Sequence, residues 1–292
     1  MGRDLWQASP AAKQVFETAD RILGYELSRV CFEGPDERLL ETEYAQPAIF
    51  TVSLACLAAA IEAGSVSRRP LFLAGHSLGE YSALVASGAL SLEEGLRLLQ
   101  ERARLMAAAG SHNPGTLAAI IGLDEAAVLA ICGEADVDVC NLNLPTQSVV
   151  GGTRAAVKRA MALAKERGAQ RAIELNVSGA FHSRLMQPAA DALTPLVQQA
   201  DILAPEVPVI GNSTAAAIID AASVRTELAA QVAQPVRWHR SITLMANEGV
   251  TSFIEFGPGR VLTGLAKRLV PEAKLINISN LAEVESAARA TA

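Results

Sequence analysis

The serine best placed for covalent chemistry lies in residues 75–79, which read Gly-His-Ser-Leu-Gly. This spacing matches G-x-S-x-G, the pattern of a nucleophile elbow. The apolar run at 71–74 predicts a buried strand before it, and residues 80–86 predict a helix after it. That order places Ser77 at the carboxyl end of a strand and directs the N–H groups and positive dipole end of the helix at the site. The pattern therefore predicts a serine nucleophile beside groups that stabilise an oxyanion.

A serine hydroxyl is a weak nucleophile until a base accepts its proton, and histidine is the usual base near neutral pH. The histidines of the chain are His76, His112, His182 and His239. His76 adjoins the serine and is expected to point away from its hydroxyl, His112 lies in a predicted loop, and His239 lies between two arginines. His182 follows the last strand predicted for residues 114–187, at the junction of two parts of the fold, where clefts usually form. Spacing alone leaves each of them open to a structural role.

Arg102 is the second position that points to chemistry. In the helix predicted for 91–109 it lies beside the apolar stripe, whereas Arg104 faces the polar side. An arginine on an apolar flank needs an anionic partner. That partner is either a structural carboxylate such as Glu80 or a substrate carboxylate held in a bidentate manner, and the residues by themselves favour the structural carboxylate.

The elements that position these residues are those of an α/β fold. Residues 114–187 predict the order βαββαβ, which is typical of a ferredoxin-like subdomain. Residues 1–113 and 188–292 predict a large α/β subdomain with a hydrolase-like parallel-sheet core, into which the ferredoxin-like unit is inserted. We expect a polar turn at 42–46 followed by a buried apolar helix at 48–63. The core strands are predicted at 71–74, 207–211, 251–256 and 274–278.

Composition narrows the classes of function. The chain has 292 residues, half of them hydrophobic, so it can bury a sizeable core. Its net charge of −6 argues against a general nucleic-acid binder. The first residues lack the apolar region of a signal peptide, and the longest apolar run, at 54–61, is too short to span a bilayer. We therefore expect a cytoplasmic enzyme with no nucleic-acid and no membrane partner.

Several motifs together carry a resemblance to a known family. Residues 75–80, Arg102 and residues 179–183 are similar to the malonyl-CoA:acyl carrier protein transacylases, which include the acyltransferase domains of polyketide and fatty acid synthases. The resemblance implies malonyl-CoA as substrate, acyl carrier protein as partner, and a role in fatty acid or polyketide biosynthesis. We further expect a monomer that uses no metal or cofactor. Supporting matches run through nearly the whole chain: Gln46-Pro47-Ala48, Asn141-Leu142-Asn143, Gln231, Pro235-Val236-Arg237-Trp238 and residues 257–262.

The resemblance also implies catalytic roles. Ser77 attacks the malonyl thioester with His182 as general base, and the resulting malonyl-serine ester passes its acyl group to the phosphopantetheine thiol of the carrier protein. A backbone carbonyl, here that of Gln231, orients the histidine in place of an aspartate. The backbone N–H of Leu78 is one donor to the oxyanion.

Substrate recognition is implied in the same way. Arg102 matches the arginine that holds the free malonyl carboxylate, which reverses the preference for a structural carboxylate. Phe181 is the bulky residue associated with selection of malonyl over methylmalonyl groups. One methyl group changes binding by only ~1–3 kcal/mol in such a pocket, so this selection is expected to be incomplete. His76 and Asn143 match positions near the acyl group.

One departure from the family pattern leaves other functions open. Family members begin with a strand and a Gly-Gln-Gly-Ser-Gln loop ahead of the segment that matches Met1-Gly2, and the loop supplies a second oxyanion donor; the present sequence starts after it. Loss of such a donor can cost roughly 10²–10³ in rate. The alternatives are a catalytically impaired scaffold that binds carrier proteins, and an acyl-carrier-protein acyl hydrolase, which would have no use for Arg102.

A basic segment suggests how a carrier protein is attracted. Residues 153–171 contain six lysines or arginines and one acidic residue, Glu166, in a chain that is acidic as a whole. Because carrier proteins of the family are acidic, the sequence leads to the hypothesis that this helix helps to steer the partner, although a merely solvated face is the simpler interpretation.

Overall fold

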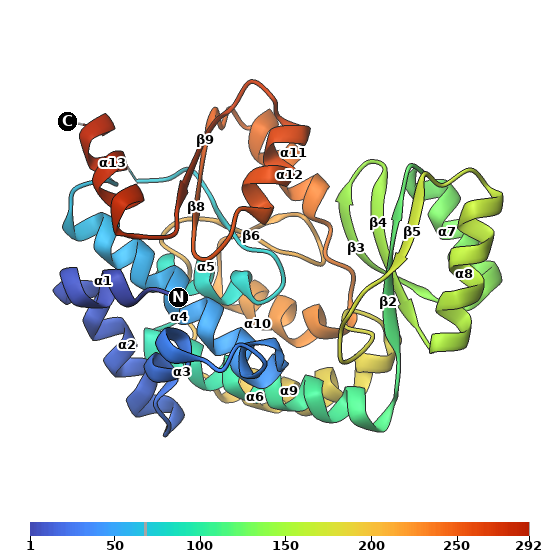
Figure 1. Cartoon of the computed structure of the whole chain (residues 1–292), viewed down its shortest axis with the longest axis horizontal. Helices are drawn as coiled ribbons and strands as arrows, with labels where there is room; N and C mark the ends of the chain where they lie inside the picture. The colour runs from blue at the N-terminus through green and yellow to red at the C-terminus, as the bar shows by residue number, and fades with distance from the viewer. Residues whose placement is uncertain (67–68, 292) are drawn as a thin grey trace.

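The computed structural model describes residues 1–66 and 69–291 and is a mixed α/β protein, as the sequence predicts (Figure 1). Its helices are α1 (Arg3–Ala8), α2 (Pro10–Leu23), α3 (Leu27–Glu33), α4 (Thr42–Glu62), α5 (Gly79–Ala86), α6 (Leu92–His112), α7 (Glu125–Ala135), α8 (Arg154–Glu166), α9 (Gln187–Gln199), α10 (Ala221–Ala230), α11 (Trp238–Asn247), α12 (Val261–Leu269) and α13 (Leu281–Thr291). Its strands are β1 (Leu73–Ala74), β2 (Thr116–Ile121), β3 (Asp138–Leu144), β4 (Gln147–Gly152), β5 (Arg171–Glu174), β6 (Val209–Ile210), β7 (Ala217–Ile218), β8 (Ser252–Phe256) and β9 (Lys274–Ile278).

A four-stranded antiparallel sheet stands at one end of the molecule (Figure 1, right). Its strand order is β3-β4-β2-β5, and the chain runs β2-α7-β3-β4-α8-β5, the predicted succession of elements. One face of the sheet buries Ile120 and Val150 against α7 and α8. The other face packs Leu117 and Val149 against Ala180, two residues before His182. The sheet therefore fixes the segment that carries the predicted base.

The remaining strands form two small sheets among the described residues, where the sequence predicts one parallel core. β1 pairs in parallel with β6, β6 pairs antiparallel with β7, and β8 pairs in parallel with β9. The strands predicted at 71–74 and 207–211 are only two residues long. These strands are short because β1 is paired only on the side of β6. Its other edge pairs with no strand in the described part of the chain, and Leu71 is 61 % exposed. A strand extends only as far as partners satisfy its backbone.

The central helix α4 differs from the prediction at its start. The segment 42–46 is not a turn, because α4 begins at Thr42 and contains Pro47. Proline removes its own N–H from the helix ladder and crowds the carbonyl four residues earlier. The side-chain amide of Gln46 donates to Thr42 Oγ1 at 2.8 Å, which supports the first turn.

The helix α4 is also longer than the apolar run noted in the sequence. Among the described residues, α4 is the helix whose length and composition would suffice to cross a membrane, although the uninterrupted apolar run within it, at 54–61, is too short to do so. However, 61 % of its apolar window is buried inside the protein. It packs against α2, α6 and α13, with Phe50 and Ala55 fully buried, and is the core helix of this part of the fold.

Candidate active site

The nucleophile elbow is present as predicted, between β1 and α5. Ser77 has a φ of 52°, a left-handed conformation that costs a non-glycine residue of order 1–3 kcal/mol and is concentrated at functional sites. Gly75 is required by close approach, since a Cβ there would lie 2.0 Å from the carbonyl carbon of Gly79. Gly79 itself has open space around it and a negative φ, so only the first of the two glycines is needed for the turn.

His182 lies at hydrogen-bond distance from the serine. Its Nε2 is 2.7 Å from Ser77 Oγ, and its Nδ1 is 2.9 Å from the carbonyl of Gln231 and 3.2 Å from that of Gln234. Carbonyl oxygens only accept hydrogen bonds, so Nδ1 carries the proton and Nε2 is free to accept from the serine hydroxyl. Burial, reinforced by the Arg102 cation, lowers the pKa of His182 to about 3, so the ring is neutral and ready to act as a base.

Arg102 completes the contacts of the serine. It is 1 % exposed, and its Nη2 donates to Ser77 Oγ at 3.0 Å and to Gln231 Oε1 at 2.9 Å, while its Nη1 donates to Gln46 Oε1. These acceptors are neutral. No carboxylate of the described chain forms an ion pair with Arg102, and Glu80 acts on it only through a Coulomb interaction without a direct contact. A buried guanidinium without a carboxylate partner is suited to an anionic ligand.

Gln231 contributes more than the predicted backbone carbonyl. Its side chain accepts from Arg102, and its Nε2 donates to the backbone carbonyl of Ser77 at 2.9 Å. One residue at the end of α10 thus contacts Ser77, His182 and Arg102, so a movement of this residue would disturb all of them together.

The other predicted site residues surround this centre. His76 Nε2 lies 3.0 Å from Asn143 Oδ1 on β3, and its ring is tilted against Trp238, so it points away from the serine as predicted. Burial lowers the pKa of His76, which keeps the ring neutral. The backbone N–H of Leu78 has no acceptor in the described part of the chain and is free for a ligand. Phe181 is half-buried beside His182 and packs on the main core cluster.

Two buried amides of the site were not predicted as functional from the sequence. Gln46 entered only as part of a motif, because the sequence predicts a polar turn at 42–46, whereas in the structure it lies near the start of α4. Asn212, 1 % exposed, bonds to both sides of the elbow. An asparagine after a strand is an ordinary turn residue, so the sequence carried no distinctive signal for it.

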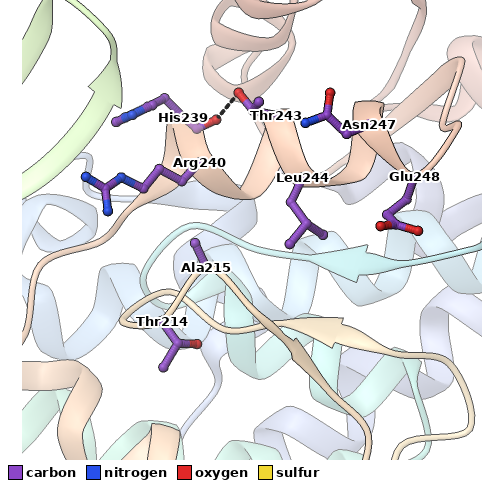
Figure 2. Close-up of a pocket in the computed structure, with 8 residues that line it drawn as sticks. All are labelled: Thr214, Ala215, His239, Arg240, Thr243, Leu244, Asn247 and Glu248. Carbon is purple, nitrogen blue, oxygen red and sulfur yellow. Dashed lines mark hydrogen bonds between the residues drawn. The ribbon is translucent and has the colours of Figure 1, made fainter.

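The remaining histidines lie away from the serine. His112 is exposed at the end of α6, with its Nδ1 bonded to the carbonyl of Ala108. His239 bonds to the carbonyl of Leu142 at 3.1 Å. His239 also lines a cavity of about 540 Å³ between α11 and the loop that follows β6, as Figure 2 shows, and no residue of the serine centre lines this cavity. Neither histidine can serve as the base.

Comparison with known proteins identifies relatives of this chain. The family described as acyl transferase domain matches residues 1–287. The malonyl CoA-acyl carrier protein transacylase of Bacillus subtilis (strain 168) is 44 % identical, and the alignment covers 98 % of this chain and 91 % of that protein. The crystal structure of an acyl-carrier-protein S-malonyltransferase from Bartonella henselae has 40 % identity and a TM-score of 0.95, covering 99 % of this chain and 94 % of that one. A malonyl-transacylase solved in complex with a type II polyketide synthase acyl carrier protein has 37 % identity and a TM-score of 0.95, with the same coverage.

The matched family and the fold define an acyltransferase. Relatives this similar over nearly their full length also settle the narrower family. The chain belongs to the malonyl-CoA:acyl carrier protein transacylases.

Proposed function

We propose that Ser77 accepts a malonyl group from malonyl-CoA and passes it to the phosphopantetheine thiol of an acyl carrier protein. The observation that carries this proposal is the position of Ser77 Oγ, 2.7 Å from His182 Nε2 and 3.0 Å from Arg102 Nη2. The first contact activates the hydroxyl, and the second places a buried cation beside it. Together they suit an acyl donor that ends in a carboxylate.

In the first half-reaction Ser77 Oγ attacks the thioester carbonyl and gives its proton to His182 Nε2. The Leu78 N–H, which is free in the described chain, is placed to donate to the oxyanion of the tetrahedral intermediate. When the carbon–sulfur bond breaks, the CoA thiolate leaves and takes the proton from His182. The carbonyls of Gln231 and Gln234 hold Nδ1–H and stabilise the transient imidazolium.

The second half-reaction reverses the roles of the groups. The carrier-protein thiol gives its proton to His182 Nε2 and its sulfur attacks the malonyl-serine carbonyl. The bond between the carbonyl carbon and Ser77 Oγ then breaks, and His182 returns the proton to the serine. One base with a fixed tautomer therefore serves both transfers.

Arg102 is proposed to bind the free carboxylate of the malonyl group. Without substrate, Arg102 donates to side-chain amides and a hydroxyl, all of which are neutral. A substrate carboxylate would therefore not have to displace another anion from the guanidinium. Phe181 is proposed to limit the room for a branch at the α-carbon. His76 and Asn143 are proposed to line the acyl group.

The proposed domain division follows the same logic. Residues 1–113 and 188–292 would form the hydrolase-like large subdomain, and residues 114–187 the inserted ferredoxin-like subdomain. The strand order β3-β4-β2-β5 supports the second assignment, because it is the order 2-3-1-4 within the unit, with all neighbours antiparallel. Ser77 and Arg102 would then come from the large subdomain, and His182 from the junction.

An acyl carrier protein is the proposed partner, as in the solved complex of a related malonyl-transacylase. The steering hypothesis for the basic helix meets a geometric difficulty. Lys158 and Arg159 are exposed on α8, which covers the face of its sheet that is turned away from Ala180 and His182 (Figure 1). At physiological salt, charges act over only ~8 Å, so α8 would matter only if the partner reaches that outer face. Monomeric state, cytoplasmic location and independence of cofactors stay predictions from the sequence. Service in fatty acid or polyketide synthesis is supported by the relatives, one of which is a malonyl-transacylase solved with a type II polyketide synthase acyl carrier protein.

The test is mass spectrometry of the protein after incubation with malonyl-CoA. We expect one malonyl adduct on Ser77, its discharge on addition of holo acyl carrier protein, and no adduct in Ser77→Ala. Rapid loss of the adduct in water without an acceptor thiol would favour the hydrolase. A folded protein that forms no adduct would favour the carrier-protein-binding scaffold.

A further inference from the structure

The position of Ser77 depends on a side chain from a different strand. Asn212 follows β6, the parallel neighbour of β1. Its Oδ1 accepts from the Ser77 N–H at 2.7 Å, and its Nδ2 donates to the carbonyl of Gly75 at 2.7 Å. The amide therefore bridges a carbonyl and an N–H two residues apart, one on each side of His76.

This bridge reproduces, with a side chain, the hydrogen bonds that a further residue pair of the parallel strands β1 and β6 would make. In a parallel pair, a residue bonds to the carbonyl before and to the N–H after its partner residue. The backbones of β1 and β6 pair through Ala74 and Ile210 and then separate. The carboxamide of Asn212 takes the place of the missing backbone, so the turn at Ser77 is held although no strand pairs there in the described part of the chain.

Asn212 is itself fixed on every side. Its backbone N–H donates to Glu80 Oε2 at 2.7 Å, and its carbonyl accepts from the Arg237 N–H at 2.9 Å. Glu80 is fully buried in the first turn of α5, the helix that starts beside Ser77. The elbow, the end of β6 and the start of α5 thus form one closed hydrogen-bonded unit around the serine.

We propose that Asn212 is a positioning residue, whose carboxamide holds the Gly75 carbonyl and the Ser77 N–H so that Ser77 Oγ meets His182. A second consequence concerns the oxyanion. Because Asn212 occupies the Ser77 N–H, that group cannot serve the oxyanion, and the free Leu78 N–H remains as the donor at the elbow. The inference rests on the proposed function of Ser77 and deepens it.

The experiment compares Asn212→Ala with the wild-type protein by single-turnover malonylation and by steady-state transfer. We expect kcat to fall about 10²-fold, the scale of a misplaced reacting group, while KM for malonyl-CoA changes less than twofold. A fall in kcat without a change in KM distinguishes a positioning role of Asn212 from a general loss of structure, which would alter both constants. A serine-directed fluorophosphonate supplies a second readout, since its reaction with Ser77 should slow by a similar factor and needs no malonyl recognition.

Asn277→Ala is the matched control. Asn277 also donates its Nδ2 to a glycine carbonyl, that of Gly259 at 3.0 Å, but it lies at the end of β9 outside the serine centre. We expect this variant, which loses one side-chain hydrogen bond where Asn212→Ala loses two, to keep wild-type kcat. The isosteric Asn212→Asp, which retains an acceptor for the Ser77 N–H and loses the Nδ2 donor, should lower kcat about tenfold.

The proposal is overturned if folded Asn212→Ala keeps kcat within threefold of the wild type, or if it raises KM and leaves kcat unchanged. Failure of both Asn212 variants to fold would assign this residue to stability alone and would also overturn it. A wild-type protein that labels with the fluorophosphonate but never malonylates would instead contradict the proposed function, and the comparison of labelling rates would still decide the role of Asn212.

Discussion

The guanidinium of Arg102 donates to the hydroxyl of Ser77 at 3.0 Å, although the arginine is 1 % exposed. The cation has two opposing effects on Ser77 and His182, the pair proposed to carry out the chemistry. It favours the negative charge that develops on Ser77 Oγ during attack, and it helps to lower the pKa of His182, which weakens the base. A carboxylate bound to Arg102 would reduce both effects, so substrate binding is coupled to the basicity of the histidine.

Arg102→Ala tests the carboxylate assignment. Removal of a charge-assisted, desolvated contact costs about 1.5–3 kcal/mol, so malonylation of Ser77 should slow about 10- to 100-fold. Acetyl-CoA carries no free carboxylate, so its rate should fall much less and the malonyl/acetyl ratio should drop. The ratio is measured by competition of the two thioesters in single-turnover mass spectrometry.

The matched control for this prediction is Arg104→Ala. Arg104 lies on the same helix, is exposed, and bonds to Glu101 at 2.7 Å, so the variant loses an equal charge away from the site. It should leave the ratio unchanged. An Arg102→Ala protein with the wild-type malonyl/acetyl ratio would show that the arginine does not bind the carboxylate.

The pH dependence of malonylation tests the state of His182. Burial first, and then the Arg102 cation, lower its pKa to about 3, whereas an unperturbed histidine has a pKa near 6.5. A lowered pKa means that the base stays unprotonated as the pH falls, so kcat/KM for malonyl-CoA should be flat from pH 8 to pH 5. An acidic limb with its midpoint near pH 6.5 would contradict the buried, neutral histidine. Exposed His112→Ala should leave the profile unchanged.

The elbow could be predicted from the sequence because strand, turn and helix are local and Gly75 is required by a backbone contact. The pairing of Ser77 with His182 could not, because 105 residues separate them and each histidine was open to a structural role. The predicted position of His182 at the junction of two parts of the fold favoured it, and the resemblance to a family then selected it and turned Arg102 from a structural ion pair into a proposed ligand for the substrate. Asn212 was missed because its role arises where two strands separate, which depends on tertiary structure.

Phe181→Ala tests the size limit at the substrate α-carbon. Phe181 adjoins His182 and is half-buried, so loss of its ring should open space beside the acyl group. One methyl group is worth ~1–3 kcal/mol in such a pocket, so the methylmalonyl/malonyl ratio should rise about 10-fold or more. Phe32→Ala removes an equally half-buried ring on α3, packed on Trp6 and Phe16, and should not alter the ratio. An unchanged ratio in Phe181→Ala would move the size limit to another residue.

Glu80 provides the last prediction, which concerns stability. Burial raises the pKa of Glu80 well above its usual value, and Glu227 raises it further, while the Asn212 N–H and the Arg102 cation oppose the shift. Below the unfolded-state pKa, near 4.3, both states bind the proton and the group has no effect on pH dependence. As the pH rises above that value, the unfolded chain releases the proton and the folded chain retains it. The free energy of unfolding therefore falls as the pH rises towards the folded-state pKa.

Glu80→Gln removes this titration and keeps the shape and the acceptor for Asn212. Because only the wild type loses stability through this proton as the pH rises, the difference in free energy of unfolding between the variant and the wild type should grow in favour of the variant from pH 4 to pH 8. Urea unfolding at a series of pH values measures the difference, with exposed Glu166→Gln on α8 as the control for loss of a charge. A difference between Glu80→Gln and wild type that stays constant from pH 4 to pH 8 would mean that Glu80 is ionised in the folded protein. In that case the Asn212 N–H would be held by a carboxylate, and the serine centre would contain a buried negative charge to balance Arg102.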